Sequence, residues 1–316
     1  MRLVFAGTPE PAVVALQKLI DSDHEVVAVL TQPDARRGRG RTLHPSAVAE
    51  LATRHGIEVI KPTSLKVDTE DGQMVRERLA ELKPDCLPVV AFGQLITRDL
   101  LDIAPHGWVN LHFSLLPEWR GAAPVQAAIR EGDHITGATC FRIDEGLDTG
   151  VILSMLEDEI RASDTADDLL TRLAYSGADL LVQTMTDLEQ GAITPREQTG
   201  EATYASKITT EDARIDWSQA AEVIDRHIRA HTPGPGAWTT LDDARVKVGP
   251  VTFISAEMVD VPTLAPGAIS AGKNTVYVGT GTRAVVLGQI QPPGKKMMNS
   301  ADWARGVHID QEANFI

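Results

Sequence analysis

The sequence predicts an α/β fold in which a doubly wound, Rossmann-like parallel sheet is followed by a smaller domain of short strands. Short apolar runs alternate with helical patterns through residues 1–190, as in parallel sheets whose strands are joined by helices. The runs are continuous rather than alternating, which fits strands that are buried on both faces. Beyond residue 207 the chain changes to short strand-like pieces separated by glycine and proline, which is typical of a small barrel or sandwich.

The elements of the first part follow from this pattern in chain order. Apolar runs predict buried strands at residues 3–6, 26–30, 57–60, 86–91 and 109–113. Amphipathic patterns predict helices at residues 11–19, 47–55, 74–82 and 122–130. Pro88 interrupts the fourth run, and because proline removes a backbone donor, we expect a bulge or a strand that starts only at Val89.

Later elements suggest where the first domain ends. Residues 136–143 alternate as an antiparallel strand would, with 151–156 as the expected partner, and residues 165–188 form a long amphipathic pattern. Periodicity is then lost, so we predict a first domain at 1–190, a linker at 191–206 and a second domain at 207–316. In the second domain one helix is expected at 220–230, followed by strands at 237–241, 245–248, 251–255, 268–269, 275–278 and 284–290. The residues themselves do not determine the type of barrel.

Composition limits the class of protein. Among 316 residues 43% are hydrophobic and 23% charged, which is ordinary for a folded soluble chain, and no apolar run is long enough to cross a membrane. The N-terminus enters a strand pattern directly, without the features of a leader, and Cys86 and Cys140 both lie in apolar runs. We therefore expect a cytoplasmic protein with reduced, buried thiols.

Charge is distributed unevenly along the chain. The net charge is −14, but residues 207–316 contain 11 Lys and Arg against 12 Asp and Glu, so the acidity lies almost wholly in the first two-thirds. This balance disfavours general nucleic-acid binding. A nucleic-acid partner would have to use local basic patches.

The turn after the first strand disfavours a nicotinamide cofactor. Gly7-Thr8-Pro9 stands where a dinucleotide-binding fold carries G-x-G-x-x-G, and two of those three glycines are missing. Pyrophosphate binding requires close approach of the backbone, so we interpret this motif as a tight turn.

The strongest chemical signal is an amide and an imidazole two residues apart. On a strand at 109–113, Asn110 and His112 point to one face, while Leu111 and Phe113 point to the other. This pairing suits carbonyl chemistry, because an amide can stabilise an oxygen that gains charge and an imidazole can move protons. A polar strand end with an ordinary structural histidine is the alternative that an Asn-x-His pair alone would favour.

The longer motifs resemble those of the folate-dependent formyltransferases. The resemblance is carried by Asn110-x-His112-x-Ser114-Leu-Leu-Pro117-x-x-Arg120-Gly121 and by Leu147-Asp148-Thr149-Gly150. Phe5-Ala-Gly-Thr-Pro9, Arg120-Gly-Ala-Ala-Pro124-Val-Gln126 and Gln291-Pro-Pro-Gly-Lys-Lys296 extend it over essentially the whole chain. It implies an OB-like C-terminal domain and formyl transfer from 10-formyltetrahydrofolate to the α-amine of initiator methionyl-tRNA.

The resemblance also implies site residues. Asn110, His112 and Asp148 are the expected catalytic set, and a carboxylate beside His112 should raise the pKa of its imidazole and fix its tautomer. The expected folate-binding segment comprises Ser114, Leu115, Leu116 and Pro117. Phe113 occupies a position where the family commonly has a small residue.

Basic residues at two places are candidates for contact with tRNA. Arg36, Arg37, Arg39 and Arg41 lie within six residues between Pro33 and Pro45, and the resemblance favours Arg39 as the residue that enters the acceptor end of the tRNA. In the second domain the candidates are Lys207, Lys295 and Lys296. A solvated charge run is the alternative for the arginines, and simple solubility is the alternative for each lysine.

Two other functions remain open from the sequence. One is formyl transfer to an amine on a nucleotide-linked sugar, against which the arginine loop and the barrel domain count. The other is a non-enzymatic RNA-binding protein, against which the set of Asn110, His112 and Asp148 counts. The remaining histidines, including the i, i+4 pair His227 and His231, have no convincing ligand spacing, so no metal is expected. No association motif stands out, so we expect a monomer.

Overall fold

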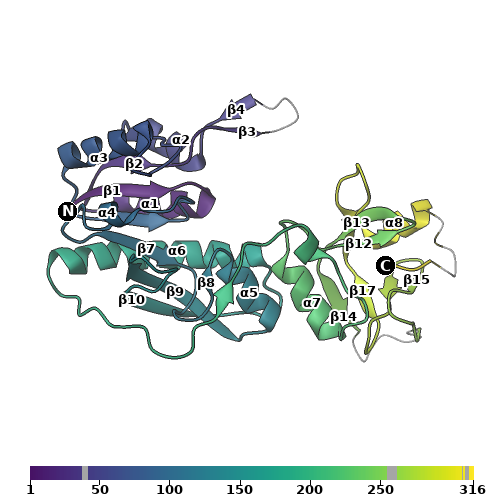
Figure 1. Cartoon of the computed structure of the whole chain (residues 1–316). Coiled ribbons are helices and arrows are strands. Elements are labelled where there is room, and N and C mark those ends of the chain that lie inside the picture. Colours follow the sequence, from purple (N-terminus) through teal and green to yellow (C-terminus); the bar gives the residue numbers. More distant parts are fainter. Residues whose placement is uncertain (38–41, 255–261, 308, 310–312) are drawn as a thin grey trace. The chain divides into compact units, whose positions relative to one another are not determined.

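A computed structural model of the chain describes residues 1–37, 42–254, 262–307, 309 and 313–316 (Figure 1). The chain divides into two units. The first comprises residues 1–121, 135–159 and 170–204, and the second comprises 122–134, 160–169 and 205–316. Segments 122–134 and 160–169 thus belong to the second unit, although in sequence they lie between segments of the first. The domain limits at residues 190 and 207 remain a prediction.

The first unit is built on a seven-stranded sheet in the order β10-β9-β7-β6-β1-β2-β5. Its strands are β1 (Arg2–Gly7), β2 (Glu25–Leu30), β5 (Glu58–Ile60), β6 (Leu87–Val90), β7 (Trp108–His112), β9 (Ile135–Arg142) and β10 (Ile152–Glu159). The first five are parallel, and β9 and β10 add an antiparallel edge. This arrangement confirms the predicted doubly wound α/β fold, and it places the end of β7 where such sheets bind ligands.

Pro88 lies inside β6, so the expectation that the strand starts at Val89 is wrong. Pro88 is opposite Val109 of β7, and that ladder continues through Val89 and Asn110. On the β1 side, pairing is limited to Ala6–Val89 and Gly7–Val90, with an isolated bridge between Leu3 and Cys86. Pro88 has no amide proton to donate, and it lies where the β1–β6 ladder has no paired residues, so the strand tolerates proline there.

Most predicted helices form close to the expected positions. The helices of this part of the chain are α1 (Glu10–Ile20), α2 (Ala47–Arg54), α3 (Glu70–Leu82), α4 (Arg98–Leu101), α5 (Pro124–Glu131) and α6 (Ala166–Glu189). The Ser46 hydroxyl accepts from the Ala49 amide and starts α2, and Thr69 does the same for α3 through Gly72. The Thr69 cap explains why α3 starts four residues before the predicted 74.

Two short paired strands that were not predicted lie on either side of residues 38–41. Strands β3 (Ala35–Arg37) and β4 (Thr42–His44) pair in an antiparallel ladder, with Arg36 opposite Leu43 and Arg37 opposite Thr42. Both strands are only three residues long, which is too short for a period-2 signal. Residues 38–41, which include Arg39 and Arg41, lie outside the described residues.

The second unit contains two four-stranded antiparallel sheets, in the orders β12-β13-β18-β19 and β14-β17-β16-β15. The strands are β12 (Trp238–Leu241), β13 (Ala244–Val248), β14 (Val251–Phe253), β15 (Ile269–Ala271), β16 (Val276–Val278), β17 (Val285–Leu287), β18 (Gln289–Gln291) and β19 (Met298–Asn299). The predicted single strand at 284–290 is split at Gly288, so that β17 and β18 belong to different sheets. Strands that change sheets at such corners are typical of barrel-like packing.

One apolar core fills the second unit. Trp217, Trp303 and Phe315 form its aromatic part, with Phe315 stacked at centroid distances of 5.6 Å and 6.2 Å from the two indoles. Besides the strands, the described part of this unit contains helix α5, the start of α6, helices α7 (Ala221–Ala230) and α8 (Ser300–Val307) and the turn η1 (Glu211–Ala213). The short strands β8 (Arg120–Gly121) and β11 (Tyr204–Ala205) complete the elements. None of the described helices is both long and apolar enough to span a bilayer.

Candidate active site

Strand β7 places the amide and the imidazole on one face, as predicted. Asn110 is opposite Phe141 of β9 and His112 is opposite Thr139, so the two side chains leave the sheet on the same side. Asn110 is partly exposed, whereas His112 is 6% exposed. Within the described part of the chain, the Asn110 amide makes no hydrogen bond, so its N–H groups are available to a ligand.

Asp148 reaches the same place from the loop between β9 and β10. Its Oδ2 lies 3.8 Å from Nδ1 of His112 and accepts a 2.7 Å hydrogen bond from the amide of Gly121. Asp148 has a φ of +51°, a left-handed conformation that the surrounding loop must enforce. Gly150 allows that loop to return to the sheet, because a Cβ there would overlap the carbonyl oxygen of Arg142.

The tautomer of His112 follows from its other nitrogen. Nε2 lies 2.9 Å from the carbonyl oxygen of Trp119, and only an N–H can bond to a carbonyl, so Nε2 carries the proton. In the neutral ring Nδ1 is then the basic nitrogen, and it faces the Asp148 carboxylate. A proton taken up at Nδ1 would be stabilised by that negative charge.

The net pKa of His112 differs from the sequence expectation. Burial is the largest effect and holds the pKa below its usual value, although the charge of Asp148 and the hydrogen bond to Trp119 each raise it. The predicted direction of the Asp148 effect is therefore confirmed, but the predicted rise is wrong because desolvation outweighs it. His112 is neutral at pH 7 and ready to accept a proton.

The segment Ser114–Pro117 divides into a structural half and an accessible half. The Ser114 hydroxyl is fully buried and donates to the carbonyl of Glu118 at 2.6 Å, and Leu116 is 3% exposed. Thr139 holds the segment, since its hydroxyl donates to the Ser114 carbonyl and accepts from the Leu116 amide. Leu115 and Pro117 are partly exposed, so of the four predicted folate-binding residues these two offer surface to a ligand.

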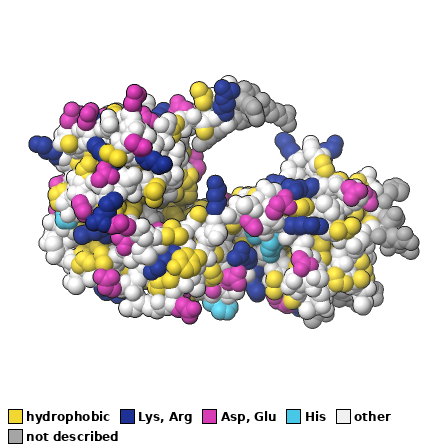
Figure 2. Space-filling model, in the orientation of Figure 1, with side chains coloured by type: hydrophobic (Ala, Val, Ile, Leu, Met, Phe, Trp, Pro, Cys, Tyr) yellow, Lys and Arg dark blue, Asp and Glu magenta, His cyan; other side chains and the backbone are white. Residues whose placement is uncertain are grey.

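The predicted basic residues are distributed over both units. Arg36 is exposed on β3, and Lys207, Lys295 and Lys296 are exposed in the second unit. Lys295 and Lys296 lie in the turn between β18 and β19, where the Lys295 amide donates to Pro292. On the face in Figure 2, the coloured Lys and Arg side chains of each unit stand among Asp and Glu.

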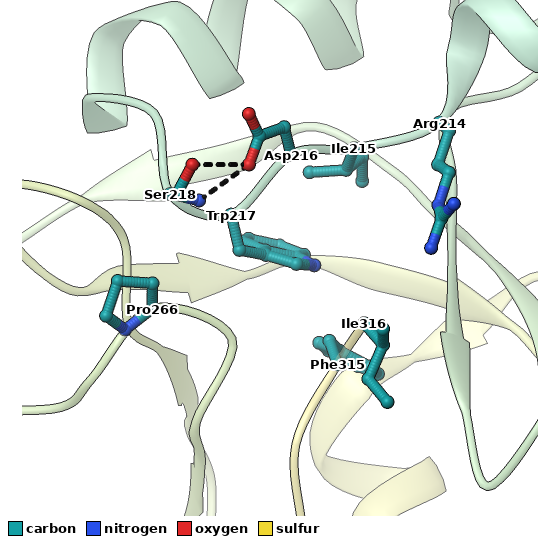
Figure 3. Close-up of a pocket in the computed structure, with 8 residues that line it drawn as sticks. All are labelled: Arg214, Ile215, Asp216, Trp217, Ser218, Pro266, Phe315 and Ile316. Atoms are coloured by element: carbon teal, nitrogen blue, oxygen red, sulfur yellow. Dashed lines mark hydrogen bonds between the residues drawn. The ribbon is translucent and has the colours of Figure 1, made fainter.

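Two other features bear on the search for sites. A pocket of about 430 Å³ in the second unit is lined by Arg214, Ile215, Asp216, Trp217, Ser218, Pro266, Phe315 and Ile316 (Figure 3). None of these is a predicted site residue. Among the described residues, no three His, Cys, Asp or Glu side chains are grouped so that they could hold a metal ion.

One residue beside the site was missed by sequence reasoning. Gln198 hydrogen-bonds both Arg120 and the loop that carries Asp148. It lies in the aperiodic stretch 191–206, where no local pattern distinguishes it from its neighbours.

Comparison with known proteins finds matches over most of the chain. Residues 1–185 match the family model described as formyl transferase, and residues 207–308 match the model for the formyl transferase C-terminal domain. A relative from Corynebacterium efficiens named methionyl-tRNA formyltransferase is 82% identical over 315 residues, covering 100% of both chains.

Solved structures show the same fold at low identity. WlaRD, a sugar 3N-formyl transferase, superposes with a TM-score of 0.66 at 19% identity, over 94% of this chain and 99% of that one. Methionyl-tRNA formyltransferase from Clostridium thermocellum gives a TM-score of 0.56 at 17% identity, over 82% of this chain and 96% of that one. Together with the two matching family models, these comparisons show that the chain belongs to the formyl transferase family.

Proposed function

We propose that this chain transfers the formyl group of 10-formyltetrahydrofolate to the α-amine of initiator methionyl-tRNA in the cytoplasm, acting as a monomer. Identity of 82% over the full length to a relative of that name supports the choice of substrate. The observation that carries the proposed chemistry is the 3.8 Å separation between Asp148 Oδ2 and His112 Nδ1. The side-chain amide of Asn110, which has no hydrogen bond among the described residues, lies on the same face of β7 as His112.

The reaction begins with attack of the neutral α-amine on the formyl carbon. A new C–N bond forms while the carbonyl electron pair moves onto the formyl oxygen, giving a tetrahedral species. The Asn110 side-chain N–H donates to that oxygen. Because the amide makes no hydrogen bond to the described residues, it is free for this one and need not break another.

His112 then moves the proton that the reaction must transfer. Nδ1 accepts a proton from the attacking nitrogen, and the Asp148 carboxylate stabilises the resulting imidazolium. The same proton passes to N10 of the folate, the C–N10 bond breaks, and the carbonyl re-forms. The products are the formylated amine and tetrahydrofolate, and His112 returns to its neutral form.

Other predicted residues hold the two substrates. Leu115 and Pro117 are the accessible members of the segment proposed to border the folate, while Ser114 and Leu116 fix its backbone. The arginines at 36–41 are proposed to contact the acceptor end of the tRNA. Lys207, Lys295 and Lys296 are proposed to contact its backbone, and such contacts to phosphate are screened by salt.

An amino-sugar nucleotide is the second candidate acceptor. The superposition on WlaRD favours it only through the fold, because identity there is 19%. The arginine-rich sequence at 36–41 and the identity to the Corynebacterium efficiens relative favour tRNA.

An acceptor assay tests the proposal. The full chain is incubated with 10-formyltetrahydrofolate and either methionyl-tRNA, uncharged tRNA or an amino-sugar nucleotide, and formylation of the acceptor is followed. We expect turnover with methionyl-tRNA alone. Turnover with the amino-sugar nucleotide instead would show that the sugar amine, and not methionyl-tRNA, is the acceptor. Binding of tRNA without turnover would support the RNA-binding alternative.

A further inference from the structure

The aperiodic segment between residues 196 and 203 is bonded to both loops of the candidate site. At one end Arg196 and Ile152 exchange two backbone hydrogen bonds, of 2.8 Å and 2.9 Å, just after the Asp148 loop. At the other end Thr203 accepts from the amides of Trp119 and Arg120, the first through its hydroxyl and the second through its carbonyl. The segment therefore spans the distance between the loop of Asp148 and the loop after β7.

Gln198, near the middle of this segment, joins the two loops through one side chain. Its Oε1 accepts from Nε and Nη2 of Arg120 at 3.2 Å and 2.7 Å. Its Nε2 donates to the carbonyls of Asp148 and Gly150 at 2.8 Å and 2.9 Å. Both donors of the amide and its acceptor oxygen are thus used.

The backbone groups that bond to His112 and Asp148 come from the loop after β7, which Gln198 joins to the Asp148 loop. The carbonyl that fixes the His112 tautomer belongs to Trp119, and the amide that holds the Asp148 carboxylate belongs to Gly121. Arg120 lies between these two residues. Asp148 is also held in a left-handed conformation, which persists only when neighbours enforce it.

We propose that Gln198 is a positioning residue that sets the separation between the Asp148 carboxylate and the His112 ring. This inference rests on the proposed function for its kinetic consequence, but the geometric consequence does not depend on the substrate. Without the Gln198 amide, the carbonyls of Asp148 and Gly150 lose their donor and the Asp148 loop relaxes. The carboxylate then stabilises a proton on His112 less well.

Three variants separate positioning from general stability. Gln198→Met has similar length and no polar atoms. Gln198→Glu keeps an acceptor for Arg120 but has no donor for the two carbonyls at neutral pH. Gln183→Met is the matched control, because Gln183 is an exposed amide on α6 whose side chain, among the described residues, bonds only to Asp187.

Each variant of the full chain is assayed for formyl transfer to methionyl-tRNA, and the His112 imidazole is titrated by NMR, with His112→Asn identifying its signal. We expect both Gln198 variants to lose about 10- to 100-fold in kcat, with KM for methionyl-tRNA changed by less than about threefold, because misplacement by about 1 Å has costs of this order. The pKa of His112 should fall in Gln198→Met, which adds no charge, and stay unchanged in Gln183→Met. For Gln198→Glu the readout is kcat, because its new carboxylate itself favours the protonated ring.

Three outcomes decide the inference. A wild-type kcat in folded Gln198→Glu, or a wild-type kcat and His112 titration in folded Gln198→Met, would overturn it. So would a loss of kcat in proportion to a lower Tm with an unchanged His112 titration, since that result describes a purely structural residue. If the wild-type chain fails to formylate methionyl-tRNA, the proposed function fails, while the titration still decides the role of Gln198. Should Gln198→Met not fold, Gln198→Glu gives the same decision.

Discussion

The carboxylate of Asp148 lies 3.8 Å from Nδ1 of His112, while Nε2 of the same ring donates to the carbonyl of Trp119. The ring therefore has one nitrogen fixed by the backbone and one basic nitrogen beside a negative charge. Burial keeps that ring neutral, and Asp148 makes its protonated form accessible. A group in this state suits a reaction that takes up and returns one proton in each cycle.

Asn110→Ala tests the proposed stabilisation of the formyl oxygen. Loss of one donor of this kind costs about 10²–10³ in turnover, so we expect kcat to fall by that factor while Tm changes little. Steady-state kinetics and a thermal melt of the same preparation measure both. Gln94→Ala, which removes a side-chain amide bonded to the Pro62 carbonyl, is a comparison for loss of an amide elsewhere in the first unit. Wild-type turnover in folded Asn110→Ala would remove Asn110 from the mechanism.

Asp148→Asn tests the charge separately from the hydrogen bond. Asparagine retains an oxygen for the Gly121 amide but carries no charge, so the pKa of His112 should fall further and kcat should drop by about 10-fold or more. Asp144→Asn is the control, because Asp144 is an exposed acid in the same loop. The measurement is kcat of both variants as a function of pH. Equal activity in the two variants would contradict a role for the Asp148 charge.

Arg39→Ala tests the arginine-rich segment, although Arg39 itself lies outside the described residues. A lost phosphate contact should weaken binding of methionyl-tRNA and reduce the slope of its salt dependence by about one unit. Arg54→Ala, which removes an exposed arginine from α2, should leave that slope unchanged. Identical slopes for wild type and Arg39→Ala across a salt series would exclude the residue from the interface.

Acid should destabilise the chain through His227. Burial, followed by the neighbouring His231 ring, lowers the pKa of His227 to about 4. Between pH 6.5 and 4 the unfolded chain thus binds a proton that the folded chain does not, so the free energy of unfolding falls as pH falls, by up to about 3 kcal/mol from this group. His227→Gln should make that decline less steep, and urea unfolding at pH 7.5 and 5 measures it. An equal decline in His227→Gln and in the exposed-residue control His55→Gln would contradict the assignment.

Both cysteines should be inert in the folded chain. Cys86 and Cys140 are fully buried and free, and burial raises the pKa of their thiols to about 12 and about 11. A thiol reagent should modify neither of them until denaturant is added, after which both should react. Ser206→Cys, which places a thiol at an exposed position, should react at once. Rapid labelling of native wild type would show that one of the buried strands opens.

Strands and helices with a clear apolar pattern could be predicted from the sequence. Features that depend on contacts between distant residues could not. Buried strands such as β1 have a continuous apolar signal, so their positions could be read directly. Helix α4 and the strands β3 and β4 are too short to show any periodic pattern. The break at Gly288 was missed because an apolar strand that changes sheets has the same local pattern as one that continues.

The candidate site shows the same division. The face shared by Asn110 and His112 follows from strand alternation, whereas Asp148 was chosen by family resemblance from three nearby acids. The low pKa of His112 depends on how deeply the folded chain buries the ring, which one sequence motif does not contain. Gln198 has no motif of its own, since its role arises only when Arg120 and Asp148 meet in space.

The most direct measurement is the single-turnover rate of formyl transfer to methionyl-tRNA by wild type and by His112→Ala, with tRNA binding measured in parallel. We predict rapid transfer by the wild type and, in His112→Ala, a rate lower by about 10² or more with the affinity for tRNA retained. A folded His112→Ala chain that transfers the formyl group at the wild-type rate would contradict the account.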